Sequence, residues 1–272
     1  MANLKYVEDY DNSFDTKVYL NSVYKAFDGP ENVEAHLDFR LKELQKFWST
    51  FEPLKSSKND TSTLLDFGGG PVIVNLVSAA PKVHRIVVAE YTEANRNAMR
   101  LWINGNTDAY DWSPYIKYIV KDLEGNVNKE TPSFRMQELK QKIKSIVPGD
   151  ITKKPIVELN PDDINKQFDV VSTTLCLEVC TSSVTEYKAA VVELCKLVKP
   201  GGYLYMAGTL ESTFYTFAGE RFYVFPLTQE VIEEAMQEGG ILGVKFKTQP
   251  LKANRELSDA KAGFVAYGHL NY

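Results

Sequence analysis

The chain has 272 residues, of which 44% are hydrophobic and 25% charged, and its net charge is −5. These values suit a globular protein with a substantial core, and the acidic balance argues against a nucleic-acid partner, whose phosphates need a basic surface. No apolar run approaches the roughly 18 residues that cross a bilayer, and the polar, acidic amino terminus is not that of a signal peptide.

In chain order, residues 1–55 are predicted to be helical, because aromatic and aliphatic side chains recur at helical spacing until Pro53 and the polar stretch Lys55–Thr61. Strands then alternate with helices, which indicates an α/β fold around a mostly parallel, doubly wound sheet. The last two strands lack a helix between them, which predicts an antiparallel hairpin at one edge. The predicted strands are Thr63–Phe67, Arg85–Ala89, Ile116–Val120, Phe168–Thr173, Gly202–Met206, Gly243–Thr248 and Gly263–Gly268, and the predicted helices are Ile73–Ser78, Thr92–Asn104, Ser133–Ser145, Ser183–Leu197 and Thr228–Gly239.

The first of these strands runs into a glycine turn, Gly68-Gly69-Gly70, and the second is followed by an acid, Glu90. Glycine lets a ligand approach the backbone closely, and an acid about 20 residues further on can accept hydrogen bonds from ribose hydroxyls. Ile73 stands where a dinucleotide site has its third glycine, and no Gly-Lys-Ser/Thr tripeptide follows. S-adenosylmethionine, which has a ribose and no phosphate, therefore fits better than NAD or ATP, although ligand-free α/β proteins contain similar turns.

The three cysteines, Cys176, Cys180 and Cys195, are odd in number, which suits reduced thiols in a cytosol better than a disulfide framework. Their spacing differs from that of a zinc knuckle, and no histidine lies near them in the sequence. We therefore expect no metal site and interpret these residues as small buried side chains.

Longer motifs resemble those of a known family. Asp111-Trp112-Ser113-Pro114 and Asp122-Leu123-Glu124-Gly125-Asn126 are more specific than the glycine turn, and Leu175-Cys176-Leu177-Glu178 and Lys199-Pro200-Gly201-Gly202 follow in the same order and spacing. Over nearly its whole length the chain resembles the small-molecule amine methyltransferases that include nicotinamide, phenylethanolamine and indolethylamine N-methyltransferases. The resemblance implies a single domain with the seven-stranded Rossmann-like class I methyltransferase fold, in which residues 1–55 form a helical lid and residues 60–272 the core. It also implies S-adenosylmethionine as methyl donor.

Carried over position by position, the resemblance implies a set of donor contacts. Aromatic residues of the amino-terminal segment would close over the methionine part, the glycine turn would pass beneath it, and Glu90 would hold the ribose. Asp150 would flank the adenine, although an acid after Pro148-Gly149 is also an ordinary surface-turn residue. The full set is Tyr10, Tyr19, Tyr24, Gly68, Gly69, Gly70, Glu90, Asn95, Asp150, Ile151 and Thr174.

At the acceptor end the resemblance implies that Glu178 and Asp259 hold the amine, with Ser212 and Tyr215 beside them. Without the resemblance, Glu178 reads as a helix-capping or solvent-facing acid, Asp259 as a loop acid and Tyr215 as a core residue. Two further positions, Gly208 and Val224, replace an aspartate and a serine of the nicotinamide enzyme, which argues against nicotinamide as the preferred substrate.

The reaction implied is direct displacement at a sulfonium methyl group, which depends on alignment and on a dry aromatic pocket. The predicted catalytic residues are Glu178, Asp259 and Tyr24. The number of acids separates an amine substrate from a neutral one, because a cationic amine needs both carboxylates, whereas a neutral sulfur atom gains nothing from them.

Four functions follow from these patterns: a methyltransferase for a small aromatic or biogenic amine; one for a pyridine-type nitrogen, thiol or thioether; a non-catalytic nucleoside-binding module; and a dehydrogenase, which Ile73 disfavours. We expect a cytoplasmic monomer that acts on a small molecule and binds neither membrane nor nucleic acid.

Overall fold

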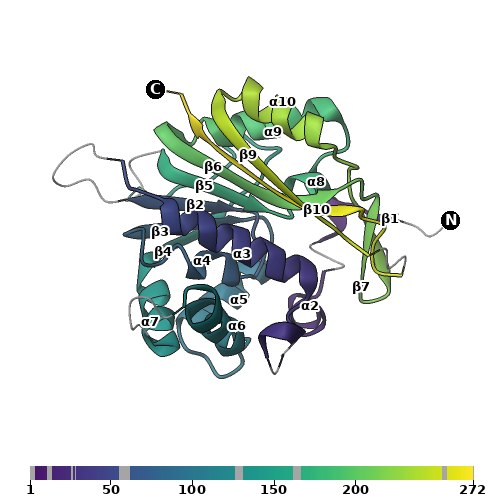
Figure 1. Ribbon diagram of the computed structural model, residues 1–272. Coiled ribbons are helices and arrows are strands. Elements are labelled where there is room, and N and C mark those ends of the chain that lie inside the picture. The colour runs from purple at the N-terminus through teal and green to yellow at the C-terminus, as the bar shows by residue number, and fades with distance from the viewer. Residues whose placement is uncertain are drawn as a thin grey trace.

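The computed structural model describes residues 4–10, 14–25, 27, 29–54, 62–125, 131–161, 167–252 and 256–271. A seven-stranded sheet has the order β4-β3-β2-β5-β6-β10-β9, and a three-stranded sheet has the order β1-β8-β7 (Figure 1). The strands are β1 (Leu4–Lys5), β2 (Thr63–Phe67), β3 (Arg85–Glu90), β4 (Ile143–Pro148), β5 (Phe168–Thr174), β6 (Val198–Leu210), β7 (Phe214–Phe217), β8 (Glu220–Tyr223), β9 (Ile241–Pro250) and β10 (Ala262–Leu270). The helices are η1 (Val7–Asp9), α2 (Thr16–Val23), η2 (Pro30–Asn32), α3 (Ala35–Thr50), α4 (Val74–Val77), α5 (Glu93–Ile103), α6 (Ser113–Tyr118), η3 (Ile119–Leu123), α7 (Pro132–Lys142), α8 (Leu177–Cys180), α9 (Val184–Cys195) and α10 (Gln229–Glu238).

The large sheet is mostly parallel and is covered by helices on both faces. Strands β4, β3, β2, β5 and β6 pair in parallel, and β10 pairs antiparallel with both β6 and β9. Adjacent residues of one strand enter different cores, since Leu64 packs with α3, α4 and α6, whereas Leu65 packs with α8, α9 and α10. The predicted α/β fold and the antiparallel hairpin at one edge are therefore confirmed.

Several helices begin at a side chain that accepts a hydrogen bond from the first turn. Thr92, Ser183 and Thr228 do this for α5, α9 and α10, and Glu34 does it for α3. The bounds of α5, α9 and α10 agree with the predicted ranges to within two residues. In each case the capping residue marks the start of the helix, and the apolar period stops near its end.

One predicted strand is wrong. Residues Ile116–Val120 are helical, lying in α6 and η3, and Pro114 occupies the first turn, where its missing N–H is not needed. A short apolar run does not distinguish a strand from a buried helix, and Ile116, Ile119 and Val120 are all buried. The strand at that edge of the sheet is β4 instead, whose first residues the predicted helix Ser133–Ser145 had absorbed.

The amino-terminal region contains the predicted helices, α2 and α3, and also a short strand, β1, that pairs in parallel with β8. Figure 1 shows α2 and the small sheet at the same end of the large sheet, beyond the carboxyl end of β6. None of the described helices is long and apolar enough to cross a membrane. Two stretches used above, Lys55–Thr61 and Asn126, lie outside the described residues.

Candidate active site

A cavity of about 750 Å³ lies at the carboxyl ends of the parallel strands. The segments that follow β2, β3, β4 and β5 contribute Gly68, Tyr91, Gly149 and Leu175 to its walls, and the amino-terminal segment contributes Tyr10. Parallel strands end at one edge of the sheet, so segments far apart in sequence meet there. The volume suits a nucleoside together with a small second ligand.

The glycine turn is tightly packed from below. Gly68 and Gly70 have φ angles of +68° and +66°, which favour glycine. A Cβ atom on Gly68 would lie 2.1 Å from the Sγ atom of Cys176, and one on Gly69 would lie 2.4 Å from Oδ2 of Asp66. The turn is therefore packed closely against the side chains of Cys176 and Asp66. A Cβ atom on Gly70 would meet nothing within 4 Å, and all three glycines line the cavity, so the other side of the turn is open.

Asp66, to which the sequence pattern assigned no role, packs beneath this turn. Its Oδ1 atom accepts a hydrogen bond of 2.7 Å from the Ser172 hydroxyl, and burial raises the pKa of its carboxyl group to about 6. The signal that could have found it is its place as the acid two residues before the first glycine. Its Oδ2 atom is buried without a hydrogen-bond partner among the described residues and lies 2.4 Å from where a Cβ atom of Gly69 would be, so the carboxyl packs closely against the turn from behind.

Glu90 ends β3 and lines the cavity. Its Oε2 atom accepts the backbone N–H of Gly70 at 3.0 Å, and its Oε1 atom accepts Nδ2 of Asn95 at 2.9 Å and the N–H of Thr92 at 3.1 Å. Burial raises the pKa of Glu90 despite these three donors. The Thr92 hydroxyl also donates to Oε1 at 3.5 Å, whereas Oε2 has one donor in the described structure, so Oε2 is the oxygen that can still accept from a ligand hydroxyl. Asn95 is held in turn by the Thr16 hydroxyl of α2, 2.7 Å from its Oδ1.

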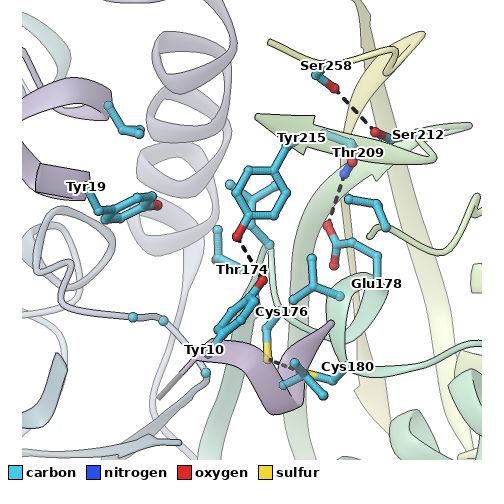
Figure 2. Close-up of a pocket in the computed structure, with 18 of the residues that line it drawn as sticks. Tyr10, Tyr19, Thr174, Cys176, Glu178, Cys180, Thr209, Ser212, Tyr215 and Ser258 are labelled. Atoms are coloured by element: carbon cyan, nitrogen blue, oxygen red, sulfur yellow. Dashed lines mark hydrogen bonds between the residues drawn. The ribbon is translucent and has the colours of Figure 1, made fainter. Parts of the chain in front are cut away.

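The aromatic residues of the amino-terminal segment reach across the cavity. The hydroxyl groups of Tyr10 and Tyr215 are 2.8 Å apart, which joins this segment to β7 (Figure 2). Tyr19 packs edge-on against Tyr24 at 6.0 Å and against Phe217 at 5.6 Å. All three tyrosines predicted from this segment line the cavity, and burial raises the pKa of Tyr10 and Tyr19 well above the ordinary range.

The residues predicted at the adenine and methionine ends also line the cavity: Asp150 and Ile151 after β4, and Thr174 at the end of β5. Burial by itself would raise the pKa of Asp150, but the hydrogen bonds that its carboxylate accepts, mainly from Thr152, outweigh burial and lower the pKa below its usual value. Asp150 is thus both a turn residue and part of the wall, so the two interpretations of it are compatible.

Glu178 lies on α8 and is only 4% exposed, so it does not face solvent. Its Oε1 atom accepts the backbone N–H of Thr209 at 3.3 Å (Figure 2). A Cβ atom on Gly208 would lie 2.4 Å from the same oxygen, so the carboxyl fills space that only glycine leaves. Burial raises the pKa of Glu178 to about 7, and Figure 2 places its carboxyl across the cavity from Tyr19.

Asp259 is placed differently from the prediction. It is absent from the described lining of the cavity, and its Oδ1 atom accepts the backbone N–H groups of Thr213 and Phe214 at 2.7 and 3.3 Å. Burial alone would raise the pKa of Asp259, but these donors and the Thr213 hydroxyl lower it. Its carboxylate holds the turn before β7 and also accepts the hydroxyl of Ser212, a residue of the cavity wall, at 3.3 Å. The pairing of Glu178 and Asp259 around one amine stays a prediction.

The other two predicted acceptor residues, Ser212 and Tyr215, do line the cavity. Sequence reasoning missed further wall residues. Cys176 and Cys180, interpreted as small buried side chains, both reach the cavity, and the signal was their position two residues on either side of Glu178. Gln249 also lines the cavity. No pattern in the sequence marked this residue, because it comes from β9, an edge strand of the sheet.

Comparison with known proteins agrees with this geometry. The model of the NNMT/PNMT/TEMT family matches residues 2–268. The chain is 33% identical to nicotinamide N-methyltransferase of Homo sapiens over 236 residues, covering 86% of this chain and 84% of the relative. It is 30% identical to indolethylamine N-methyltransferase of Mus musculus over 233 residues, with 86% and 84% covered.

Among solved structures, magnesium protoporphyrin IX methyltransferase (ChlM) from Synechocystis PCC 6803 with bound SAM superposes with a TM-score of 0.52 over 96% of this chain and 94% of that one. At 11% identity this likeness concerns the fold alone. The predicted family resemblance and methyl donor are confirmed, and the dehydrogenase and non-catalytic alternatives are set aside. The chain belongs to the NNMT/PNMT/TEMT family and is an S-adenosylmethionine-dependent methyltransferase.

Proposed function

We propose that this enzyme methylates the nitrogen of a small aromatic or biogenic amine. The observation that carries the proposal is the buried carboxyl of Glu178, which shares a cavity with the donor-side residue Glu90. A buried acid at the far end of a ligand cavity is costly unless a partner compensates it, and a cationic amine is such a partner.

The donor end fits S-adenosylmethionine. In our proposal the open glycine turn lies beneath the ligand, Glu90 accepts from the ribose hydroxyls, and Asp150 and Ile151 border the adenine. When bound, S-adenosylmethionine supplies a sulfonium methyl group that a nucleophilic nitrogen can displace. The protein's task is to hold the acceptor nitrogen in line at roughly 3–3.5 Å from the reacting carbon.

Glu178 has two tasks in this proposal, which oppose each other. As a carboxylate it binds an ammonium group, but a nearby negative charge also raises the pKa of that ammonium, which is already about 10.4 for a lysine-like amine. Its own pKa of about 7, against 4.5 for an ordinary glutamate, makes Glu178 a stronger base near neutral pH. It can therefore accept the proton that the amine must lose.

In our proposal, aromatic side chains around the cavity keep water away from the acceptor. Tyr10, Tyr19, Tyr24 and Tyr215 all line the cavity. Aromatic faces attract a cation within about 6 Å of the ring centre, so these rings support an acceptor that carries positive charge before and after methylation.

Gly208 supports an amine over nicotinamide as the preferred acceptor. A side chain at this position would collide with Glu178 and with Phe264, since an added Cβ atom would lie 2.4 Å from Oε1 of Glu178 and 2.8 Å from Cε1 of Phe264. The site is thus built around a glutamate in the volume where the nicotinamide enzyme, by the resemblance, carries an aspartate.

The test is a methyl-transfer screen with radiolabelled donor over aromatic, indole, imidazole and aliphatic amines, with nicotinamide, a thiol and a thioether included. We expect transfer to an amine that Glu178→Gln reduces strongly while donor affinity is kept. Glu230→Gln, at an exposed position in α10, is the matched control. Preference for the thiol, the thioether or nicotinamide would contradict the proposal.

The remaining expectations belong to this proposal as well. The net charge of −5 supports the absence of a nucleic-acid partner. A cytoplasmic monomer is tested by light scattering, which should give the mass of one chain, and by localisation of a tagged protein.

A further inference from the structure

Two thiols flank Glu178 in the wall of the cavity. Cys176 and Cys180 have their Sγ atoms 3.9 Å apart, and both line the cavity (Figure 2). A disulfide requires an S–S distance of about 2.05 Å, so the two sulfur atoms need to approach by about 1.9 Å. Two cysteines four residues apart across one helical turn are near enough for side-chain rotation to supply this.

The backbone around the pair is not locked in a long helix. Helix α8 has four residues, and Cys176 precedes it with φ −121° and ψ −59°, outside the helical region. The preceding residue, Leu175, has a φ of +52°, which is strained for a leucine. The pair therefore spans a single short turn and not the middle of a regular helix.

The two thiols differ in their surroundings. The Cys176 sulfur is wedged beneath the glycine turn, 2.1 Å from where a Cβ of Gly68 would be, and its side chain is buried. Cys180 is half-buried, and its thiol lies close enough to the hydroxyls of Tyr10 and Tyr215 to influence both electrostatically. Cys180 is thus the more accessible of the two.

We propose that Cys176 and Cys180 form a redox modification site, at which a small hydroperoxide converts the thiol pair into an intramolecular disulfide that suppresses methyl transfer. In the first step the Cys180 sulfur attacks a peroxide oxygen, the O–O bond breaks, and a sulfenic acid and one water (or alcohol) form. In the second step the Cys176 sulfur attacks the sulfenic sulfur, the S–S bond forms, and a second water leaves. Two thiols are oxidised and one peroxide is reduced.

The order of the steps follows from the environment of each thiol. The hydrogen bond with Cys180, together with burial, raises the pKa of the Cys176 thiol well above the ordinary range. Since the thiolate is the nucleophile toward peroxide, Cys176 is the poorer first reactant and the better resolving partner.

The disulfide would act on Glu178 because the bond spans the turn that carries it. The backbone carbonyl of Glu178 accepts the N–H of Phe225 at 2.6 Å, and its side chain accepts from Thr209. Drawing Cys180 toward Cys176 moves this turn relative to both anchors. We expect turnover to fall by about tenfold to a hundredfold, since a displacement of about 1 Å at a reacting centre costs up to that much.

The third cysteine provides a matched control. Cys195 lies in α9, where its sulfur packs against Gly239, and burial raises the pKa of its thiol to about 12. It does not belong to the described lining of the cavity.

The experiment treats the reduced full-length enzyme with hydrogen peroxide, blocks free thiols, and measures peptide masses and methyl transfer. Trypsin separates the pair, in residues 167–188, from Cys195, in residues 189–196. We expect the first peptide to lose two hydrogens in parallel with the loss of activity, and a dithiol reductant to restore both. Cys195→Ala should behave like the unmodified enzyme. Cys180→Ser, compared with its own reduced form, should keep its activity in peroxide, and neither Cys180→Ser nor Cys176→Ser should give the peptide that has lost two hydrogens.

A disulfide that forms without loss of turnover would overturn the proposal. So would peroxide-induced loss of activity in Cys180→Ser, or loss of activity in the wild type without the mass change. The mass measurement needs no methyl acceptor, so it separates failure of this inference from failure of the proposed amine substrate.

Discussion

The ionisation of Glu178 makes a prediction about stability as well as catalysis. Burial raises the pKa of this carboxyl from 4.5 to about 7. In the unfolded chain it ionises near pH 4.5, whereas in the folded protein it stays protonated until about pH 7. Between these values the folded state holds the extra proton, so the stability of the free enzyme falls as pH rises across this window and is level above it.

The size of the effect follows from the two pKa values. Each pKa unit corresponds to about 1.36 kcal/mol, so the rise from 4.5 to about 7 corresponds to about 3 kcal/mol of lost stability at pH 8 relative to pH 4. Glutamine has the same shape and does not ionise. The unfolding free energy of Glu178→Gln minus that of the wild type should therefore increase by up to about 3 kcal/mol from acidic to alkaline pH. The turnover of the variant should be lower than that of the wild type.

The assay is urea unfolding of both proteins without ligand at pH 5 and pH 8, with Glu230→Gln as the exposed control. Comparing the variant with the wild type cancels other titrating groups, such as Asp66, whose pKa burial also raises. If the stability difference between the two proteins is the same at both pH values, the carboxyl does not titrate in this window, and its role as a base near pH 7 is refuted. For an amine substrate, turnover should also rise as pH increases through about 7, which a stopped assay over pH 5–9 would follow.

Three further predictions address neighbouring groups. Glu90→Ala should weaken S-adenosylmethionine binding by about 1–3 kcal/mol, or one to two decades in Kd; calorimetry that finds unchanged affinity in a folded variant removes Glu90 from the donor site. Gly208→Ala should displace Glu178 and raise the acceptor KM with a stability loss of about 1–3 kcal/mol from overpacking, and a steady-state acceptor KM equal to that of the wild type would show that the carboxyl does not need this space. Asp259→Asn should loosen the turn at Thr213 and lower the melting temperature with little change in donor affinity; a selective loss of amine turnover at unchanged stability would instead return Asp259 to the acceptor site.

Much of the donor site could be predicted because its signals are local. A strand, a glycine turn, a helix and a second strand ending in an acid are encoded between Thr63 and Glu90. Gly68, Gly70 and Glu90 line the cavity as that pattern predicts. The strand predicted at Ile116–Val120 was wrong because a short apolar run is a local signal. Whether such a run forms a strand or a buried helix depends on what packs around it.

The acceptor site depends on tertiary structure. Without the family resemblance, the sequence presents Glu178 as a helix-capping or solvent-facing acid and Asp259 as a loop acid. In the structure the carboxyl of Glu178 is buried in the cavity wall, whereas that of Asp259 accepts the N–H groups of Thr213 and Phe214.

The sequence by itself determined the alternating architecture, the glycine turn, the donor and the family, because periodicity, capping residues and motifs act over short distances. Tertiary structure alone decided that Tyr10 meets Tyr215, 205 residues away, and that the Cys176 sulfur lies beneath Gly68. Such contacts arise where parallel strands end at a common edge, and their partners are set by the order in which the strands pair, which no short stretch of the chain records.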